Sequence, residues 1–379
     1  MKARLKAIQN PKGESRGRGV VAIDLPTNQL LKSNQHKSID DQKLLSTTVH
    51  EVGNEELDVD AGLLSYLRTE LSENIDYEIA PKPLTGGRDS RIYQYKLQGE
   101  QPRVLRVLRP TRDADELLYL QIVYQTLSHH GITVPLIHSV CEDKSILGGS
   151  FAVMDLLSGT TLSTQEPETQ AKVLGESMAK MHNSKVKPIV DELKESGMPD
   201  ERFLAPALLK NFLNVLEKNY PWTSEHVSWL RKRVAVSGDE LSIIHGDYHA
   251  GNLMFEEGSV TGVLDWEFFI ADPAIDLAHI TNLCLIFSRH FLKDIPLKFF
   301  EQYLGKILKT YSKTRPVNHE RIKTYRVAEL LKLLCIADKI PEQLQSPEAQ
   351  RDYVEFIKNA TGIPLMFKRS AENLEIARP

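Results

Sequence analysis

The chain has 379 residues, of which 41% are hydrophobic and 26% are charged, a balance typical of globular proteins that bury a sizeable core. Its formal net charge of −4 gives no indication of a polyanion-binding surface, so we predict no nucleic-acid partner. No apolar run approaches the roughly 20 residues of a membrane-spanning helix, so we predict no membrane partner. The three cysteines form no CxxC pair, which argues against a disulfide framework or a thiolate zinc site and fits a reducing, cytoplasmic location.

Residues 1–60 are polar and show weak hydrophobic periodicity, so we predict a disordered or loosely attached N-terminal extension. Within this extension, Val20–Ile23 has the composition of one short strand. The first residues are basic but lack the apolar stretch of a secretory signal. A disordered tail and an organelle transit peptide are the two interpretations, and we favour the tail.

Residues 61–157 alternate between strand-like and turn-rich segments, with helical spacing in two places. The helical spacing occurs in Leu63–Leu71 and in Asp113–Leu127. The predicted strands are Tyr77–Pro83, Ile92–Leu97, Val104–Leu108, Val134–Val140 and Ser150–Leu157. We therefore predict a small sheet domain over residues 61–157.

After Gly159 the hydrophobic pattern becomes helical. The predicted helices are Gln170–His182, Arg202–Tyr220 and Glu225–Val236, followed by a helical pattern over residues 275–357. The chain thus divides into a strand-rich part and a helix-rich part, and the second part spans residues 158–370.

The segment Ile243–Asp276 carries the residue types that phosphoryl transfer needs. A carboxylate must orient the acceptor hydroxyl and take its proton, and oxygen ligands must hold Mg²⁺ beside the phosphates. Asp247 can supply the base, and Asn252 and Asp265 can supply the metal ligands. The spacing from Asp247 to Asn252 is also that of a protein-kinase catalytic loop. These features predict an ATP-dependent phosphotransferase.

The motif His245–Asn252, followed by Leu264–Glu267 and Asp272–Asp276, resembles the aminoglycoside phosphotransferase / choline kinase superfamily. The resemblance covers most of residues 79–286. It implies an α+β, two-lobed protein-kinase-like fold, with a small antiparallel-sheet N-lobe and a mostly helical C-lobe. It also implies ATP and Mg²⁺ as cofactors and a small molecule with a hydroxyl group as the phosphate acceptor.

The resemblance assigns a role to each matching residue of the motif. Asp247 matches the catalytic base, and Asn252 and Asp265 match the Mg²⁺ ligands. Asp276 matches an aspartate that holds the catalytic loop and the following helix, and His245 matches a histidine that is usually structural.

The resemblance also places the nucleotide in the sheet domain. It implies nucleotide contacts for Gly86, Gly87, Ser90, Arg106, Glu116, Met154 and Leu156. Arg106 stands where a lysine is common, yet it keeps a fixed cation and a fork for phosphate. Glu116 is the candidate ion-pair partner of Arg106, although it lies about one helical turn earlier than the common spacing implies.

Two alternative functions stay open beside a small-molecule kinase. A nucleotide-binding pseudokinase or scaffold module is suggested by Arg106 and by the position of Glu116, and the complete motif segment opposes it. A protein kinase is disfavoured, because the Asp-Phe-Gly and Ala-Pro-Glu segments are absent. The acceptor is not determined by the sequence, and aminoglycosides, amino alcohols, sugars, macrolides and hydroxylated metabolites remain candidates.

Overall fold

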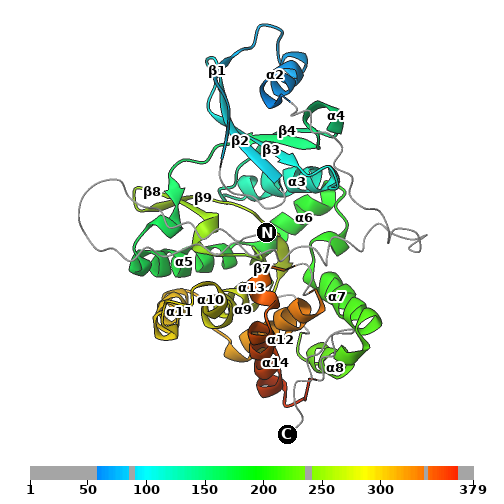
Figure 1. The fold of residues 1–379 in the computed structure, drawn as a ribbon, viewed down its shortest axis with the longest axis vertical. Helices are drawn as coiled ribbons and strands as arrows, with labels where there is room; N and C mark the ends of the chain where they lie inside the picture. Colours follow the sequence, from blue (N-terminus) through cyan, green and yellow to red (C-terminus); the bar gives the residue numbers. More distant parts are fainter. Residues whose placement is uncertain (1–57, 85–89, 235–240, 337–339, 366–379) are drawn as a thin grey trace. The chain divides into compact units, whose positions relative to one another are not determined.

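A computed structural model describes residues 58–84, 90–234, 241–336 and 340–365 (Figure 1). Residues 1–57 of the predicted extension, its short strand at residues 20–23, and the predicted phosphate-loop residues Gly86 and Gly87 lie outside the described residues. The described chain forms two compact units. The smaller unit holds the residues up to Gly159 together with Thr261–Leu264, and the larger unit holds the rest.

The smaller unit is built on a five-stranded antiparallel sheet with the strand order β1-β2-β3-β5-β4. Its strands are β1 (Tyr77–Pro83), β2 (Ser90–Leu97), β3 (Arg103–Leu108), β4 (Ile137–Cys141) and β5 (Phe151–Asp155). Its helices are α2 (Val59–Glu70), α3 (Asp115–His129) and α4 (Lys144–Leu147).

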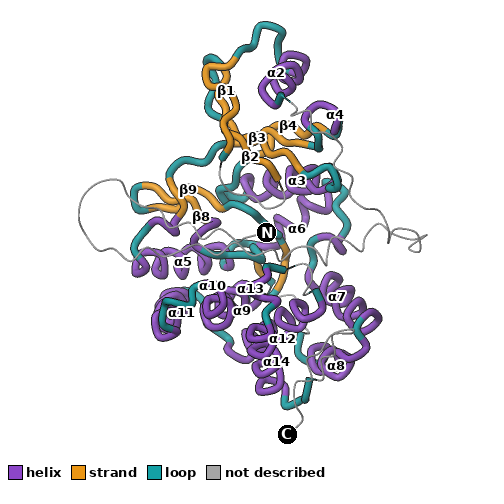
Figure 2. The backbone as a smooth tube through the Cα atoms, in the orientation of Figure 1, coloured by secondary structure: helices purple, strands orange, loops and turns teal. Residues whose placement is uncertain are grey.

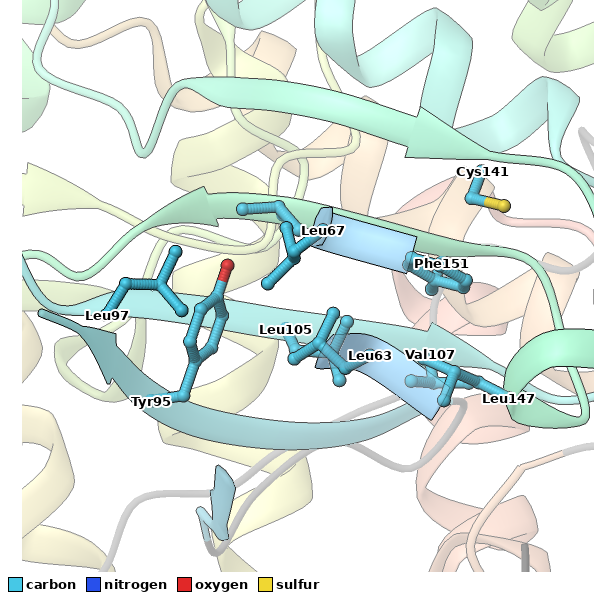
Figure 3. Packing of buried hydrophobic residues seen from close by; sticks show 10 residues of the cluster. Leu63, Leu67, Tyr95, Leu97, Leu105, Val107, Cys141, Leu147 and Phe151 are labelled. Carbon is cyan, nitrogen blue, oxygen red and sulfur yellow. The ribbon is translucent and has the colours of Figure 1, made fainter. Parts of the chain in front are cut away.

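A hydrophobic core joins helix α2 to one face of this sheet (Figure 3). Leu63 and Leu67 lie one turn apart on α2 and are buried in the same cluster as Leu105 and Val107 of β3. Because side chains alternate across a strand, Arg106 between them points to the opposite face of the sheet. The packing of α2 thus decides which face carries the Arg106 cation.

The larger unit is mainly helical (Figure 2). Its helices are α5 (Pro167–His182), α6 (Val186–Glu195), α7 (Ala205–Asn219), α8 (Ser224–Arg231), α9 (Ala274–Asn282), α10 (Ser288–Phe291), α11 (Leu297–Tyr311), α12 (His319–Cys335), α13 (Glu342–Gln345) and α14 (Pro347–Thr361). Its strands are β6 (Thr160–Thr161), β7 (Ser242–Ile244), β8 (Leu253–Glu256) and β10 (Phe269–Ala271), and β9 (Ser259–Val263) begins in this unit. Within the described residues, no helix is long and apolar enough to cross a membrane.

Two local features shape the helices of the larger unit. Helices α5 and α11 approach closely at Gly175, where an added Cβ would lie 2.6 Å from the carbonyl oxygen of Ile307. Between α9 and α10, Leu283–Phe287 forms a π-helical turn. Such turns insert one residue into a helix and change the direction of the side chains that follow.

The predicted fold class is confirmed, because an antiparallel sheet unit precedes a largely helical unit. Several element boundaries were wrong, including the start of β4 and the end of α8. The strand predicted to start at Val134 starts at Ile137, because Pro135 has no N–H for the strand ladder and the N–H of Leu136 donates to Asp155 (3.1 Å). The helix predicted to reach Val236 ends at Arg231.

Candidate active site

Two short strands position the motif loop. Strand β7 pairs antiparallel with β10, and every residue of β7 is buried. The loop His245–Asn252 leaves β7, and the segment Asp265–Phe268 leads into β10. The backbone N–H of Glu267 also donates to the carbonyl of His245 (3.0 Å). The pairing therefore brings the Asp247 and Asp265 segments to the same end of this sheet.

Asp276, in the first turn of α9, anchors the motif loop. Its carboxylate accepts the backbone N–H groups of His245 (3.0 Å) and Gly246 (2.8 Å) and lies 3.1 Å from Nε2 of His182 at the end of α5. Burial alone raises the pKa of Asp276, but its hydrogen bonds and His182 hold the pKa below the ordinary value. The ionised carboxylate thus ties the loop to α5 and α9, in the role that the resemblance implies.

Gly246 is required by the backbone of the loop. Its φ of 92° lies in the left-handed region that side chains disfavour. An added Cβ at this position would lie 2.7 Å from Cβ of Glu267. Glycine is therefore the residue that lets the Glu267 segment approach the loop so closely.

Asp247 is buried at the centre of the loop, with a side chain that is 5% exposed. Its Oδ1 lies 2.9 Å from Nε2 of His279, and its Oδ2 lies 3.6 Å from Nε2 of His249. Nδ2 of Asn252 donates to the backbone carbonyl of Asp247 (3.0 Å). Burial alone raises the pKa of Asp247, but the two histidines outweigh burial and lower the pKa. The carboxylate is consequently ionised and held in a fixed orientation.

His279 and Glu329 continue this network away from Asp247, and sequence reasoning identified neither residue. Nδ1 of His279 lies 2.6 Å from Oε1 of Glu329, and Oε2 of Glu329 accepts from Nδ2 of Asn282 (2.7 Å). Burial alone lowers the pKa of His279, but the flanking carboxylates raise it well above its ordinary value. His279 is therefore a cation between two anions. Its spacing of three residues from Asp276, on one face of α9, was the signal available in the sequence.

The two predicted metal ligands differ in exposure. Asn252 is buried, and because its Nδ2 bonds the loop, its Oδ1 is the side-chain oxygen suited to a cation. Asp265 is exposed and has a left-handed backbone with φ of 57°, which few residues other than glycine adopt. Over residues 58–365, gaps apart, no group of three or more His, Cys, Asp and Glu side chains could hold a metal ion. One carboxylate with one amide fits Mg²⁺, which takes most of its ligands from phosphates and water.

In the smaller unit, Arg106 and Glu116 form an ion pair. Nη2 of Arg106 lies 3.8 Å from Oε1 of Glu116, and the two side chains are 16% and 12% exposed. Arg112 also pairs with Glu116, with its Nε at 3.1 Å from Oε2. The early position of Glu116 on α3 therefore still allows contact with Arg106.

The other described residues predicted to bind nucleotide lie around strand β3. Ser90 is buried and pairs with Leu108 of β3, and Met154 is buried in β5 and pairs with Val104. Leu156 is half-buried and directly follows β5. The sheet register thus gathers Ser90 and Met154 on either side of β3.

Comparison with known families identifies the chain. The profile of the Phosphotransferase enzyme family (APH) matches residues 81–316. The chain belongs to this family. The matched residues include the motif loop and Asp276, whereas Glu329 on α12 lies beyond them.

Curated relatives of this chain are much longer proteins. Human acyl-CoA dehydrogenase family member 11 is 27% identical over 168 residues, which cover 41% of this chain and 22% of that protein. A probable acyl-CoA dehydrogenase of Arabidopsis thaliana is 25% identical over 199 residues, covering 48% of this chain and 24% of that protein. The chain thus spans about a quarter of the length of these relatives.

Solved structures share the fold of this chain. A putative aminoglycoside phosphotransferase from Ralstonia eutropha has a TM-score of 0.53 at 20% identity, covering 80% of this chain and 97% of that one. The macrolide 2′-phosphotransferase MphH from Brachybacterium faecium has a TM-score of 0.50 at 17% identity, covering 82% and 100%.

Proposed function

We propose that this chain is a phosphotransferase that transfers the γ-phosphate of ATP to a hydroxyl group of a small molecule. The observation that carries the proposal is the state of Asp247, a buried and ionised carboxylate oriented by His279 and Asn252. Such a carboxylate can orient an acceptor hydroxyl and take its proton while the hydroxyl oxygen attacks the phosphorus in line. The remaining catalysis is mostly positioning, which a loop anchored by Asp276 supports.

Asn252 and Asp265 would hold Mg²⁺ jointly with the nucleotide phosphates in this proposal. When bound, Mg²⁺ offsets the negative charge of the phosphates. The amicoumacin kinase solved with AMP-PNP and Ca²⁺ has a TM-score of 0.50 at 15% identity, covering 74% of this chain and 88% of that one. A related fold therefore binds a nucleotide and a divalent cation, which supports the same cofactor classes here.

The nucleotide-binding residues of the proposal lie in the smaller unit. Arg106 would contact the phosphates together with Ser90, Gly86 and Gly87, and Glu116 would orient Arg106. The ion pair between Arg106 and Glu116 supports this assignment and removes one of the reasons to favour a pseudokinase. The adenine would meet the backbone at Met154 and Leu156.

A cytoplasmic location stays a prediction. The three cysteines, Cys141, Cys284 and Cys335, are buried free thiols. Free thiols support a reducing compartment.

Transfer of labelled phosphate tests the proposed activity directly. The full chain, incubated with γ-labelled ATP, Mg²⁺ and a panel of hydroxyl compounds, is expected to transfer label to at least one acceptor and to stop when Mg²⁺ is chelated. ATP binding without transfer to any acceptor would favour the pseudokinase instead.

The substitution His279→Gln is expected to move the acid limb of the kcat/KM–pH profile to higher pH. The cation at His279 lowers the pKa of Asp247, and glutamine keeps a hydrogen-bonding group but loses that charge. The pKa of Asp247 therefore rises, and activity that needs the ionised carboxylate fails at a higher pH than in the wild type. A shift of roughly one pH unit corresponds to about 1.4 kcal/mol of lost interaction.

A matched control for this substitution is His290→Gln. His290 pairs with Asp352 at 3.0 Å, away from the motif loop. Its profile is expected to coincide with that of the wild type. An unchanged acid limb in His279→Gln would show that His279 does not set the pKa of Asp247.

A further inference from the structure

An apolar pocket of about 140 Å³ lies next to the motif loop within the larger unit. Its walls come from α7, β10, α9 and α12, which are labelled in Figure 1 except for β10. The hydrophobic side chains that form the walls include Leu208, Leu209, Phe212, Phe269, Ile275 and Ala328. Pockets of this kind, with hydrocarbon walls and a few polar groups at one end, are typical of small-molecule sites.

The polar end of the pocket is the Asp247 network. Gly246, which precedes Asp247 in the chain, lines the pocket together with His279 and Glu329. Nε2 of His279 lies 2.9 Å from Oδ1 of Asp247. Asp247 itself does not line the pocket, but a molecule that fills the pocket places its polar end against Gly246 and His279, which adjoin the proposed base.

The charges at this end do not suit a polycationic acceptor. Its two carboxylates, Glu267 and Glu329, are accompanied by two cations, His279 and Lys332. Glu329 is already engaged by His279 and by Asn282. With Asp247, the second carboxylate that contacts His279, this end has three carboxylates against two cations, an excess of one, whereas binding several ammonium groups needs a larger excess of carboxylates.

We propose that the acceptor is an uncharged small alcohol whose hydrocarbon body occupies the pocket between α7 and α12 and whose hydroxyl lies beside Asp247. This inference rests on the proposed phosphotransferase function and adds the substrate class. The size of the pocket limits the hydrocarbon body, since an apolar cavity of roughly 150 Å³ takes up benzene. A chain of roughly six or seven carbon atoms fills a comparable volume.

A series of primary alcohols from 1-propanol to 1-octanol tests the proposal in the full chain with Mg²⁺ and γ-labelled ATP. The kcat/KM for phosphate transfer is expected to rise roughly fourfold with each methylene that enters the pocket. The rise is expected to stop at roughly six or seven carbons, where the pocket is full. Ethanolamine and kanamycin, which carry ammonium groups, are expected to be poor acceptors.

Substitution of Ala328 by methionine fills part of the pocket and provides a second test. Ala328→Met is expected to shorten the preferred alcohol by about three carbons, the length that the substitution adds. The matched control is Ala207→Met, because Ala207 is half-buried on α7 but does not line the pocket. The control is expected to keep the wild-type chain-length profile.

The outcomes separate this inference from the proposed function. Transfer to sugars or to kanamycin, with a flat response to alcohol chain length, would overturn the inference and leave the phosphotransferase function intact. If no acceptor is phosphorylated, calorimetry of 1-hexanol binding tests whether the pocket takes up an uncharged alcohol, because binding needs no phosphate transfer. Binding that Ala328→Met weakens and Ala207→Met preserves would support the pocket, and no binding to the wild type would overturn it.

Discussion

Asp247→Asn is expected to reduce kcat for phosphate transfer by roughly 10²–10⁴-fold, the usual contribution of a general base. Asparagine keeps the shape of the side chain and can still contact His279, but its amide cannot take a proton from the acceptor. ATP binding is expected to persist, because the proposed nucleotide contacts lie in the smaller unit. Single-turnover transfer of labelled phosphate, together with ATP titration, measures the two effects separately.

The control for this variant is Asp294→Asn, which changes the same charge at an exposed position away from the loop. Its turnover and melting temperature are expected to equal those of the wild type. Normal turnover in Asp247→Asn would remove Asp247 from the role of base. Loss of the cooperative unfolding transition in that variant would instead indicate a structural role.

Asp276→Asn is expected to lower the free energy of unfolding by roughly 1–3 kcal/mol, the cost of leaving a buried donor without its acceptor. The carboxylate accepts N–H groups from His245 and Gly246 and lies beside His182 without access to water. Asparagine removes the charge and turns one side of the group into a donor that faces other donors. Activity falls as well, because the loop that carries Asp247 loses its anchor. Urea unfolding followed by circular dichroism measures the change.

The pH dependence of this loss has a defined sign. The pKa of Asp276 lies below its ordinary value in the folded state, so its stabilising contribution is complete above the unfolded pKa of about 3.8 and disappears as the pH falls through the folded pKa. The difference in stability between wild type and Asp276→Asn is therefore expected to be largest near neutral pH and to shrink in acid. Asp352→Asn, at a partly exposed ion pair with Arg289, is the control and is expected to cost much less.

Local patterns in the sequence were enough to locate the loop and most elements of the sheet. The strand Tyr77–Pro83 was predicted with its observed limits, because turn-forming residues and a strand-like composition mark both of its ends. The role of Asp276 as the anchor of the loop was implied by the resemblance to the family, whose motif Asp276 matches, rather than by periodicity. Both depend on residues that are close in the chain or recur at fixed spacing.

The acceptor side of the site could not be predicted from the sequence, because its residues are far apart in the chain. Glu329 and Ala328 lie on α12, and nothing in the sequence of that helix tells its pocket-facing positions from ordinary core positions. The cation at His279 arises from two carboxylates that only the tertiary fold brings together. The prediction of where β4 starts was wrong for a local reason. Pro135 lies inside an otherwise strand-like run, and its missing N–H outweighs the strand propensity of Val134.

Because Asp276 anchors the loop, hydrogen exchange at the anchored amides can measure how often the loop opens locally. The amide protons of His245 and Gly246 both point into a carboxylate that is sealed from water, so neither can exchange with deuterium while the anchor holds. Their exchange rates would therefore report how often the loop detaches from α9. A bound acceptor or nucleotide would lower these exchange rates only if it stabilises the attached loop. Exchange therefore distinguishes ligands that contact the catalytic loop from ligands that bind elsewhere in the protein.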